Sequence, residues 1–295
     1  MPGQRYRVVH RTEYLYGATM LDGYSVACLL ARPTPSQAVA SSVVTTYPEP
    51  DEYDERNDAF GNRVVQFGLH QPHDGLVVEA ITEAKVWEQE LPRADVAWER
   101  VTATVAGMRG PTALDVAPFV APSRFVTVGA NRLQLFALAS TSFTPDRGVV
   151  EATTALCSDI FGRFVFDPSF TEVSSPLDVV LGERRGVCQD FAHLAVGALR
   201  TLGLAARYVS GYIETDPLPG EPKTVGADAS HAWCSVWVPD HGWLDFDPTN
   251  GIVAPSRHVT IGWGRDYADV APVRGVVVGP SSSQSLSVSV DVTRI

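Results

Sequence analysis

The chain has 295 residues, of which 45% are hydrophobic and 19% charged, as expected for a globular protein with a substantial core. Its 23 basic and 34 acidic side chains give a formal net charge of −11, which argues against nucleic acids and anionic membrane surfaces as partners. No run of 18 apolar residues occurs, and the N-terminus lacks an apolar stretch, so we expect neither a membrane span nor a signal peptide. Four cysteines without a Cys-x-x-Cys pair predict free thiols in a reducing cytoplasm rather than disulfides or structural zinc.

Residues 1–105 are expected to form an all-β unit, either a sandwich or a barrel. Residues 5–16 alternate in polarity as a strand with one buried face does. Turns that contain Gly, Pro and Asp separate further short strands, predicted over residues 64–67, 76–82 and 84–87. His10 and His70 have no ligand partners nearby in the sequence, so we interpret them as packing or surface histidines.

Helical patterns follow a stretch at 106–124 that lacks periodicity and is rich in Gly and Pro, as a linker would be. Leu133, Phe136 and Ala137 predict one short helix. Thr144 and Pro145 offer an N-cap and a first-turn proline for a second helix that continues to about residue 162. A helical turn over 176–183 then precedes the central element of the chain.

That central element is a helix predicted to begin at residue 188. Its apolar residues recur with helical spacing, at Phe191, Leu194, Ala195, Ala198, Leu199 and Leu202. Gly203 follows them, where a left-handed residue commonly ends a helix. Cys188 would therefore occupy the first turn, where unpaired N–H groups and the helix dipole favour a thiolate. A small buried cysteine is the alternative interpretation.

Three strands are predicted after this helix, over residues 206–213, 231–238 and 243–247. A short turn joins the last two, so they read as an antiparallel hairpin with His231 at its start and Asp247 at its end. Cysteine catalysis needs a thiolate, an imidazole and a group that orients the ring, and this hairpin with the Cys188 helix offers all three. Asp245 shares a strand face with Asp247, so periodicity alone does not choose between the two carboxylates.

Three segments, 186–193, 231–233 and 242–249, resemble the core motifs of the transglutaminase-like superfamily. In that family the motif Cys is the nucleophile, the His of His-x-Trp is the base, and the Asp of Asp-Pro-Thr orients the His. The matching positions here are Cys188, His231 and Asp247. Residues 6–87 are similar to the β-rich N-terminal region of bacterial members, and the segment Gly264-Arg265-Asp266-Tyr267-Ala268-Asp269 and the final strand resemble the same subgroup.

The resemblance implies an α+β protein with papain-like relatives. We expect an N-terminal all-β domain, sandwich-like or barrel-like, over 1–105 and a linker over 106–124. A transglutaminase-like core of helices packed on an antiparallel sheet would span 125–255. The remaining residues, 256–295, would form a C-terminal β extension.

Several residues near the motifs have two interpretations. Asp190 could form a hydrogen bond at the site or cap the helix, and Trp233, which shares the His231 face with Trp237, could wall the cleft or fill the core. Gln189 and the backbone N–H of Cys188 are further candidates for supporting the reaction, the latter as an oxyanion donor. Cys234 faces the opposite side of its strand and is expected in the core.

We expect no metal and no cofactor. His193 follows Cys188 by about 1.4 helical turns, so it is predicted to lie on the helix flank, away from the thiol. A metal site made of Cys188, His193 and His231 is therefore disfavoured. The chain also shows no acidic loop like an EF-hand, although the resemblance to animal transglutaminases would imply calcium.

By the same resemblance, the chain is an enzyme that attacks an amide of a peptide or protein through a Cys188 thioester. Transfer of the acyl group to water, which we favour, gives a cysteine protease or amidase, whereas transfer to an amine gives a transglutaminase. An acyltransferase that uses a thioester donor is a further alternative, although the acidic composition speaks against a basic nucleotide groove. A non-catalytic binding module would lack some of the triad residues, and none is missing.

Overall fold

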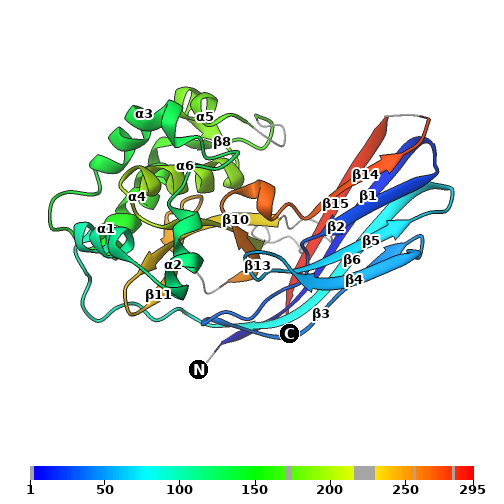
Figure 1. Cartoon of the computed structure of the whole chain (residues 1–295), viewed down its shortest axis with the longest axis horizontal. Coiled ribbons are helices and arrows are strands. Elements are labelled where there is room, and N and C mark those ends of the chain that lie inside the picture. Colours follow the sequence, from blue (N-terminus) through cyan, green and yellow to red (C-terminus); the bar gives the residue numbers. More distant parts are fainter. Residues whose placement is uncertain (1–2, 171–174, 216–229, 255–256, 281–282) are drawn as a thin grey trace, which may run out of the picture.

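The computed structural model describes residues 3–170, 175–215, 230–254, 257–280 and 283–295. A unit of helices and sheet lies beside an elongated unit made of strands, and both chain ends lie at the strand unit (Figure 1). In the part of the chain described, no helix is long and apolar enough to cross a membrane.

The elongated unit is a sandwich of two four-stranded antiparallel sheets. One sheet has the order β15-β1-β6-β3, with β1 at Gln4–Met20, β3 at Gln37–Tyr47, β6 at His73–Val86 and β15 at Gln284–Arg294. The other has the order β14-β2-β5-β4, with β2 at Asp22–Ala27, β4 at Glu52–Asn57, β5 at Arg63–Leu69 and β14 at Val273–Val278. Buried residues such as Phe67 and Val78 fill the space between the sheets, which makes the predicted all-β unit a sandwich.

The two ends of the chain meet in this sandwich. β15 runs antiparallel to β1 from the Tyr6–Arg294 pair to the Tyr16–Gln284 pair, and β14 pairs with β2. The C-terminal strands, which the sequence predicted only as an extension, are therefore integral to both sheets of the N-terminal unit (Figure 1). An alternating pattern predicts a strand and its buried face but does not identify the partner strand.

The core is built on one antiparallel sheet with the order β12-β11-β10-β9-β13. Its strands are β9 at Ala206–Ile213, β10 at Ser230–Val238, β11 at Gly242–Asp247, β12 at Ile252–Val253 and β13 at His258–Gly264. β10 and β11 form the predicted hairpin, in the register that sets Cys234 opposite Phe246. Its turn contains Asp240 and Gly242, with φ of 63° and 82°, a conformation that glycine adopts without steric cost.

Helices cover this sheet and enclose an apolar core. They are α1 at Trp98–Gly107, α2 at Pro111–Val116, α3 at Val128–Ser140, α4 at Val149–Arg163, α5 at Leu177–Glu183 and α6 at Cys188–Thr201, with a short 3-10 turn, η1, at Ala117–Phe119. α6 is the predicted central helix, and Gly203 just beyond it has φ 83°, as its position required. Leu194 and Leu199 on α6 pack with Val236 of β10, and each such side chain contributes about 1.5–3 kcal/mol on burial.

The helices α1 and α2 were not predicted, because they lie at the end of the expected all-β unit and in the expected linker, and two predicted helices differ in detail. On α3 the buried face holds Leu135 and Leu138, whereas the predicted Leu133 and Phe136 are 83% and 51% exposed. The apolar residues of α3 occur nearly all round the helix, so periodicity could not select the face that packs.

The start of α4 was also predicted wrongly. The helix begins at Val149, beyond Thr144 and Pro145, with Gly148 at its N-cap. The carboxylate of Asp95 accepts hydrogen bonds from the backbone N–H groups of the next two helical residues, at 3.0 and 2.9 Å. A residue distant in sequence thus caps the helix, and no local pattern reveals such a cap.

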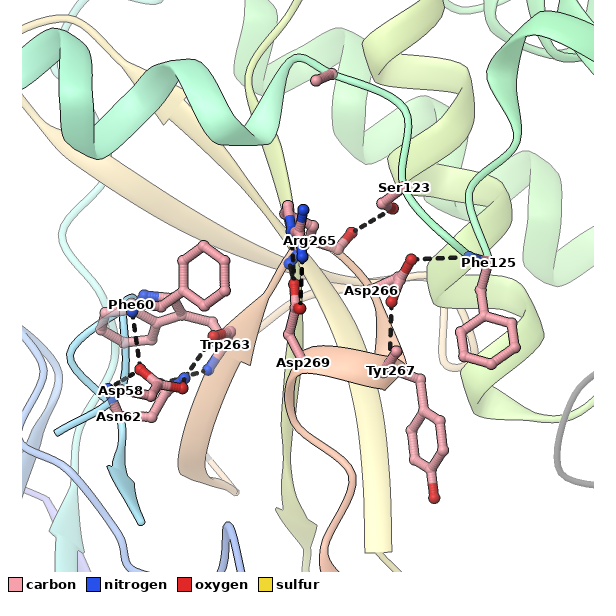
Figure 2. Close-up of polar contacts among 12 residues, drawn as sticks. Asp58, Phe60, Asn62, Ser123, Phe125, Trp263, Arg265, Asp266, Tyr267 and Asp269 are labelled. Carbon is pink, nitrogen blue, oxygen red and sulfur yellow. Dashed lines mark hydrogen bonds and ion pairs between the residues drawn. The ribbon is translucent and has the colours of Figure 1, made fainter. Parts of the chain in front are cut away.

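A buried asparagine joins the sandwich to the core sheet. Asn62 follows Gly61, whose φ is 73°, and its side chain is fully buried. Its amide group donates to the Trp263 carbonyl oxygen at 2.7 Å, while its oxygen accepts from the Trp263 N–H at 2.9 Å (Figure 2). The Asn62 amide group also donates a hydrogen bond to the Asp58 carboxylate, in the sandwich, at 2.8 Å. The Asn62 side chain thus binds the backbone of β13 with one donor and one acceptor, as a neighbouring strand would.

The residues that follow β13 tie the sheet to the predicted linker. Asp266 accepts a hydrogen bond from the Phe125 N–H at 2.8 Å and caps the short 3-10 turn η2 at Tyr267–Asp269 (Figure 2). Arg265 forms two hydrogen bonds with Asp269, both at 2.9 Å. The segment 264–269, which carried part of the family resemblance, therefore has a structural role at this junction.

Candidate active site

Cys188 is the first residue of α6, as the sequence predicted. β8 at Arg185–Gly186, which pairs in parallel with β7 at Val165–Phe166, leads the chain into the helix. The Asp190 carboxylate accepts a hydrogen bond from the Val187 N–H at 2.9 Å, so Asp190 caps the helix start. The Cys188 N–H is one of the first-turn donors that have no acceptor within the helix. The half-buried thiol lies 4.0 Å from the Ser230 carbonyl oxygen.

The hairpin brings His231 and Asp247 together. Nε2 of His231 lies 2.8 Å from Oδ2 of Asp247, and the two side chains are 7% and 0% exposed. The other ring nitrogen is left for Cys188. Burial alone lowers the pKa of His231, but its hydrogen bonds with Asp247 and Cys188 outweigh this effect and raise the pKa to about 10. The three predicted triad residues therefore meet, and the contacts with Asp247 and Cys188 favour the charged imidazole.

Asp247 is saturated with hydrogen bonds. Its Oδ1 accepts from the backbone N–H groups of Thr249 and Asn250, at 2.9 and 3.2 Å, because the chain turns back directly after β11. Its Oδ2 accepts from the Asn250 side chain at 2.6 Å in addition to His231. Burial alone would raise the pKa of this carboxyl, yet the hydrogen bonds from His231 and His258 lower it far below its usual range.

His258 is the site residue that sequence reasoning missed. It begins β13 and is 1% exposed, and its Nε2 lies 2.9 Å from the same Asp247 Oδ2. Its strand is separated from β11 by β10 and β9, so only the sheet order brings the two residues together. Asn250 was likewise not predicted, although its place just after the Asp-Pro-Thr motif was an available signal.

Trp233 packs against the rings of His231 and His258 in the protein interior. It is fully buried, its ring stacks on His231 at a centroid distance of 6.0 Å, and it meets His258 edge-on at 5.0 Å. A Cβ atom at Gly211 would collide with the Trp233 ring and the Val259 carbonyl oxygen, so this strand position requires glycine. Trp233 thus belongs to the core and fixes the planes of both imidazoles.

A cavity of about 620 Å³ opens beside Cys188 and His231. One part of its wall is apolar, formed by Phe166, Ile213 and Ile252. The polar part of its lining is Glu214, Thr215, Ser230, Thr249, Asn250 and Arg257. The thiol and the imidazole therefore face a space large enough for a side chain or a short peptide segment.

Comparison with known proteins agrees with this geometry. The family model described as the transglutaminase-like superfamily matches residues 137–248, and that of the bacterial transglutaminase-like N-terminal region matches residues 6–85. An uncharacterised Mycobacterium tuberculosis protein is 37% identical over 297 residues, covering 98% of this chain and 92% of the relative. The chain belongs to the transglutaminase-like superfamily.

Two other relatives extend the comparison for this transglutaminase-like protein. A protein-glutamine gamma-glutamyltransferase of Pseudomonas aeruginosa is 33% identical over 111 residues, which is 35% of this chain and 16% of that protein. The crystal structure of a Cytophaga hutchinsonii protein, provisionally classed as a cysteine protease, superposes with a TM-score of 0.77 at 20% identity. It covers 100% of this chain and 92% of that one, and the expected α+β fold class is confirmed.

In this transglutaminase-like core, the second hairpin carboxylate, that of Asp245, does not contact His231. The backbone of Asp245 exchanges two hydrogen bonds with the side chain of Gln89, at 2.8 and 2.9 Å. Its carboxylate acts electrostatically on Arg207, and only Asp247 contacts His231. Gln189 is half-buried in the first turn of α6, and Cys234 is fully buried, as predicted for a core residue.

His193 is a buried histidine whose contacts lie with Tyr267, Phe125 and Tyr208. It is 2% exposed, and its Nε2 accepts the Tyr267 N–H at 3.2 Å. Its ring packs on Phe125 and Tyr208, with centroids at 5.8 and 4.9 Å. Burial lowers the pKa of His193 to about 4. The segment after β13 therefore covers the side of α6 that carries His193.

The site also contains atoms that resemble a metal-binding set. His231, Asp247 and His258 each offer one ligand atom, and these atoms lie within 4.8 Å of one another. Both imidazoles, however, direct Nε2 at a single carboxylate oxygen, at 2.8 and 2.9 Å. A bound ion would have to displace both ring protons, whereas hydrogen bonding accounts for every contact. We therefore assign the cluster to hydrogen bonding.

Proposed function

We propose that this protein is a cysteine-dependent enzyme that hydrolyses amide bonds of peptides or proteins. In this proposal Cys188 is the nucleophile, His231 the acid and base, and Asp247 the group that orients His231. The observation that carries it is the meeting of these three side chains, from α6, β10 and β11, with Cys188 and His231 at the wall of one cavity and the buried Asp247 behind His231. The superfamily membership and the fold of the Cytophaga hutchinsonii protein support it.

The reaction would proceed through two acyl transfers. The Cys188 thiolate attacks the amide carbonyl carbon, and the carbonyl oxygen takes the negative charge near the unpaired Cys188 N–H. Collapse of this intermediate breaks the C–N bond, His231 gives its proton to the departing amine, and a thioester with Cys188 remains. His231 then takes a proton from water, the resulting hydroxide attacks the thioester, and the acid product leaves with the thiolate restored.

The cavity lining supports a substrate with an apolar side chain beside the reacting carbonyl. Phe166, Ile213 and Ile252 would take this side chain, at about 1.5–3 kcal/mol for a large one that becomes buried. A second candidate is transfer to an amine, since the Pseudomonas aeruginosa glutamyltransferase is similar over 111 residues. Both reactions share the thioester and differ only in the acceptor.

The proposed nucleophile is tested by thiol alkylation of the full chain. We expect iodoacetamide at pH 6 to modify Cys188 first, because Cys28, Cys157 and Cys234 are buried. Asp247→Asn should slow this alkylation on the order of 10²-fold, since the charged imidazole loses its counter-charge. Asp245→Asn, the matched control, should slow it less than about tenfold. Mass spectrometry locates the label, and thermal unfolding shows that each variant is folded. Faster labelling of another cysteine would refute the assignment.

The acceptor is tested separately. The protein is offered a peptide library in ¹⁸O water, with and without a primary amine probe, and products are identified by mass. One ¹⁸O atom in a newly formed carboxyl group supports hydrolysis, while amine incorporation that outcompetes it supports the second candidate. Neither product, from a protein whose Cys188 is alkylated rapidly, would exclude peptide amides as substrates.

A further inference from the structure

His258 contacts the proposed triad without touching the thiol or the cavity. Its ring lies between β13 and Asp247, with centroids 5.7 Å from His231 and 5.0 Å from Trp233. Gly211 on the intervening strand leaves room for the Trp233 ring, which in turn packs against His258. At 1% exposure the ring is enclosed, so its orientation is fixed by these neighbours.

The contacts of the two His258 ring nitrogens favour one tautomer. Its Nε2 faces the carboxylate oxygen of Asp247 at 2.9 Å and must therefore donate. Its Nδ1 is buried without a hydrogen-bond partner in the described part of the chain. A proton there would be an unsatisfied donor on a buried cation, so a neutral ring with its proton on Nε2 fits the contacts.

Two imidazoles thus compete for one oxygen atom. Oδ2 of Asp247 accepts from His231 at 2.8 Å and from His258 at 2.9 Å, in addition to the Asn250 amide at 2.6 Å. Each added donor spreads the negative charge of a carboxylate and weakens its attraction for the other donors. The His258 contact must therefore weaken the interaction between Asp247 and the proton of His231.

We propose that His258 is a positioning residue that limits how tightly Asp247 holds the proton of His231. This inference rests on the proposed function in that His231 is taken as the acid and base. During the two acyl transfers His231 must release a proton to the amine and then take one from water. Without the His258 donor, the buried Asp247 carboxylate would stabilise the imidazolium more strongly, and the ring would release its proton less readily.

Two groups act directly on the charge of His231, and two more charged side chains line the cavity that it faces. Cys188 on α6 and Asp247 on β11 contact it directly. Glu214, which directly follows β9, and Arg257, directly before β13, line the same cavity. The Glu214 carboxylate is engaged by Arg294 of β15 at 2.7 Å. Substitution of His258 removes a donor to Asp247 and leaves the side chains of Cys188, Glu214 and Arg257 in place, so a change in His231 titration reports on the shared oxygen.

The test compares two variants of the full chain, His258→Phe and His258→Gln. Phenylalanine keeps a ring but loses the donor, whereas the glutamine amide can place an N–H near the position of Nε2. The protein is labelled with [¹⁵N]histidine, and the ring nitrogens of His231 are followed by NMR against pH. We expect the titration midpoint of His231 to rise by about one pH unit in His258→Phe and by less than about 0.3 in His258→Gln.

Cys188 alkylation at pH 6 gives the second readout. Because Asp247 still faces the imidazolium, both variants should react within about threefold of the wild-type rate, unlike Asp247→Asn. An unchanged His231 midpoint in folded His258→Phe would overturn the inference, as would a loss of alkylation equal to that of Asp247→Asn. If His258→Phe does not fold, His258→Asn, whose donor falls short of Asp247, replaces it.

The two proposals fail in different ways. If wild-type Cys188 is not the fast thiol but the His231 midpoint still rises in His258→Phe, the proposed enzyme function fails and the shared oxygen stands. If Cys188 reacts fast and the midpoint does not move, only the role of His258 is refuted.

Discussion

Apolar packing stabilises both the helix-covered part of the core and its junction with the sandwich, but the junction adds paired hydrogen bonds to the sheet backbone. Under the helices, Leu194 and Leu199 of α6 pack on the sheet through apolar contacts alone. At the junction, Asn62 pairs with the Trp263 backbone, and Gln37 of β3 pairs with the Thr260 backbone at 2.7 and 2.8 Å. Apolar packing supplies most of the stability but tolerates small rotations of the packed elements, whereas paired hydrogen bonds fix the orientation of one element relative to the other. The sheet edge that carries His258 is thus oriented by the sandwich.

The largest expected effect comes from removing the sandwich's N-terminal strands. A fragment of residues 107–295 leaves β15 and β14 without their partners β1 and β2, and exposes Tyr212 and Val259, which pack against the sandwich. We expect no cooperative thermal unfolding transition by circular dichroism, in contrast to the full chain. A cooperative transition in this fragment would show that the junction is dispensable for folding.

Truncation of an apolar side chain under the helices should be the next largest effect. Leu194→Ala, at a fully buried position on α6, should lower the free energy of unfolding by about 2–5 kcal/mol through lost burial and a cavity. The matched control is Leu133→Ala on α3, where the side chain is 83% exposed and the change should stay below about 0.5 kcal/mol. Urea unfolding measures both, and equal losses would mean that the helix faces are assigned wrongly.

Low pH should lower the free energy of unfolding, because one histidine is buried under the helices and another at the junction with the sandwich. Burial lowers the pKa of His193, under the helices, and of His10, at the junction, to about 4 each. In the unfolded chain these histidines have an ordinary pKa of about 6.5, so they become protonated at a higher pH than in the folded protein. Their contribution to the free energy of unfolding is therefore complete above pH 6.5 and is lost as the pH falls toward 4. The loss integrates to about 3 kcal/mol for each residue.

The variant His10→Gln tests how much the junction histidine contributes to the pH dependence of the free energy of unfolding. Glutamine can keep hydrogen bonds to Tyr212 and Thr12, which lie 2.9 and 2.8 Å from the ring of His10. The free energy of unfolding of this variant, from urea titrations between pH 4.5 and 7, should fall less steeply than that of the wild type. An unchanged slope would show that His10 already takes up its proton in the folded state.

The smallest effect should come from a single junction hydrogen-bond group. Asn62→Ala leaves the Trp263 N–H and carbonyl groups without their partner and should cost about 1–3 kcal/mol. Asn57→Ala on β4, at an exposed position, is the matched control and should be nearly neutral. If the two variants unfold at the same urea concentration, the paired bonds do not stabilise the junction.

The sequence by itself determined the elements with strong local patterns. The spacing from Phe191 to Leu202 with Gly203 predicted α6 and the place of Cys188, because a helix must turn one apolar stripe inward. Alternation with a short turn predicted the β10–β11 hairpin, which brings His231 near β11. The motif match, rather than any periodicity, selected Asp247 over Asp245, and the structure places only Asp247 against His231.

Only the tertiary structure decided which distant elements meet. The pairing of β15 with β1, the cap that Asp95 gives to α4 and the approach of His258 to Asp247 each join residues far apart in the chain. Side-chain alternation and helical spacing record which face of an element is buried, but they carry no information about what covers it. The donors that surround the Asp247 carboxylate therefore depend on the order of strands in the sheet, which local sequence patterns do not specify.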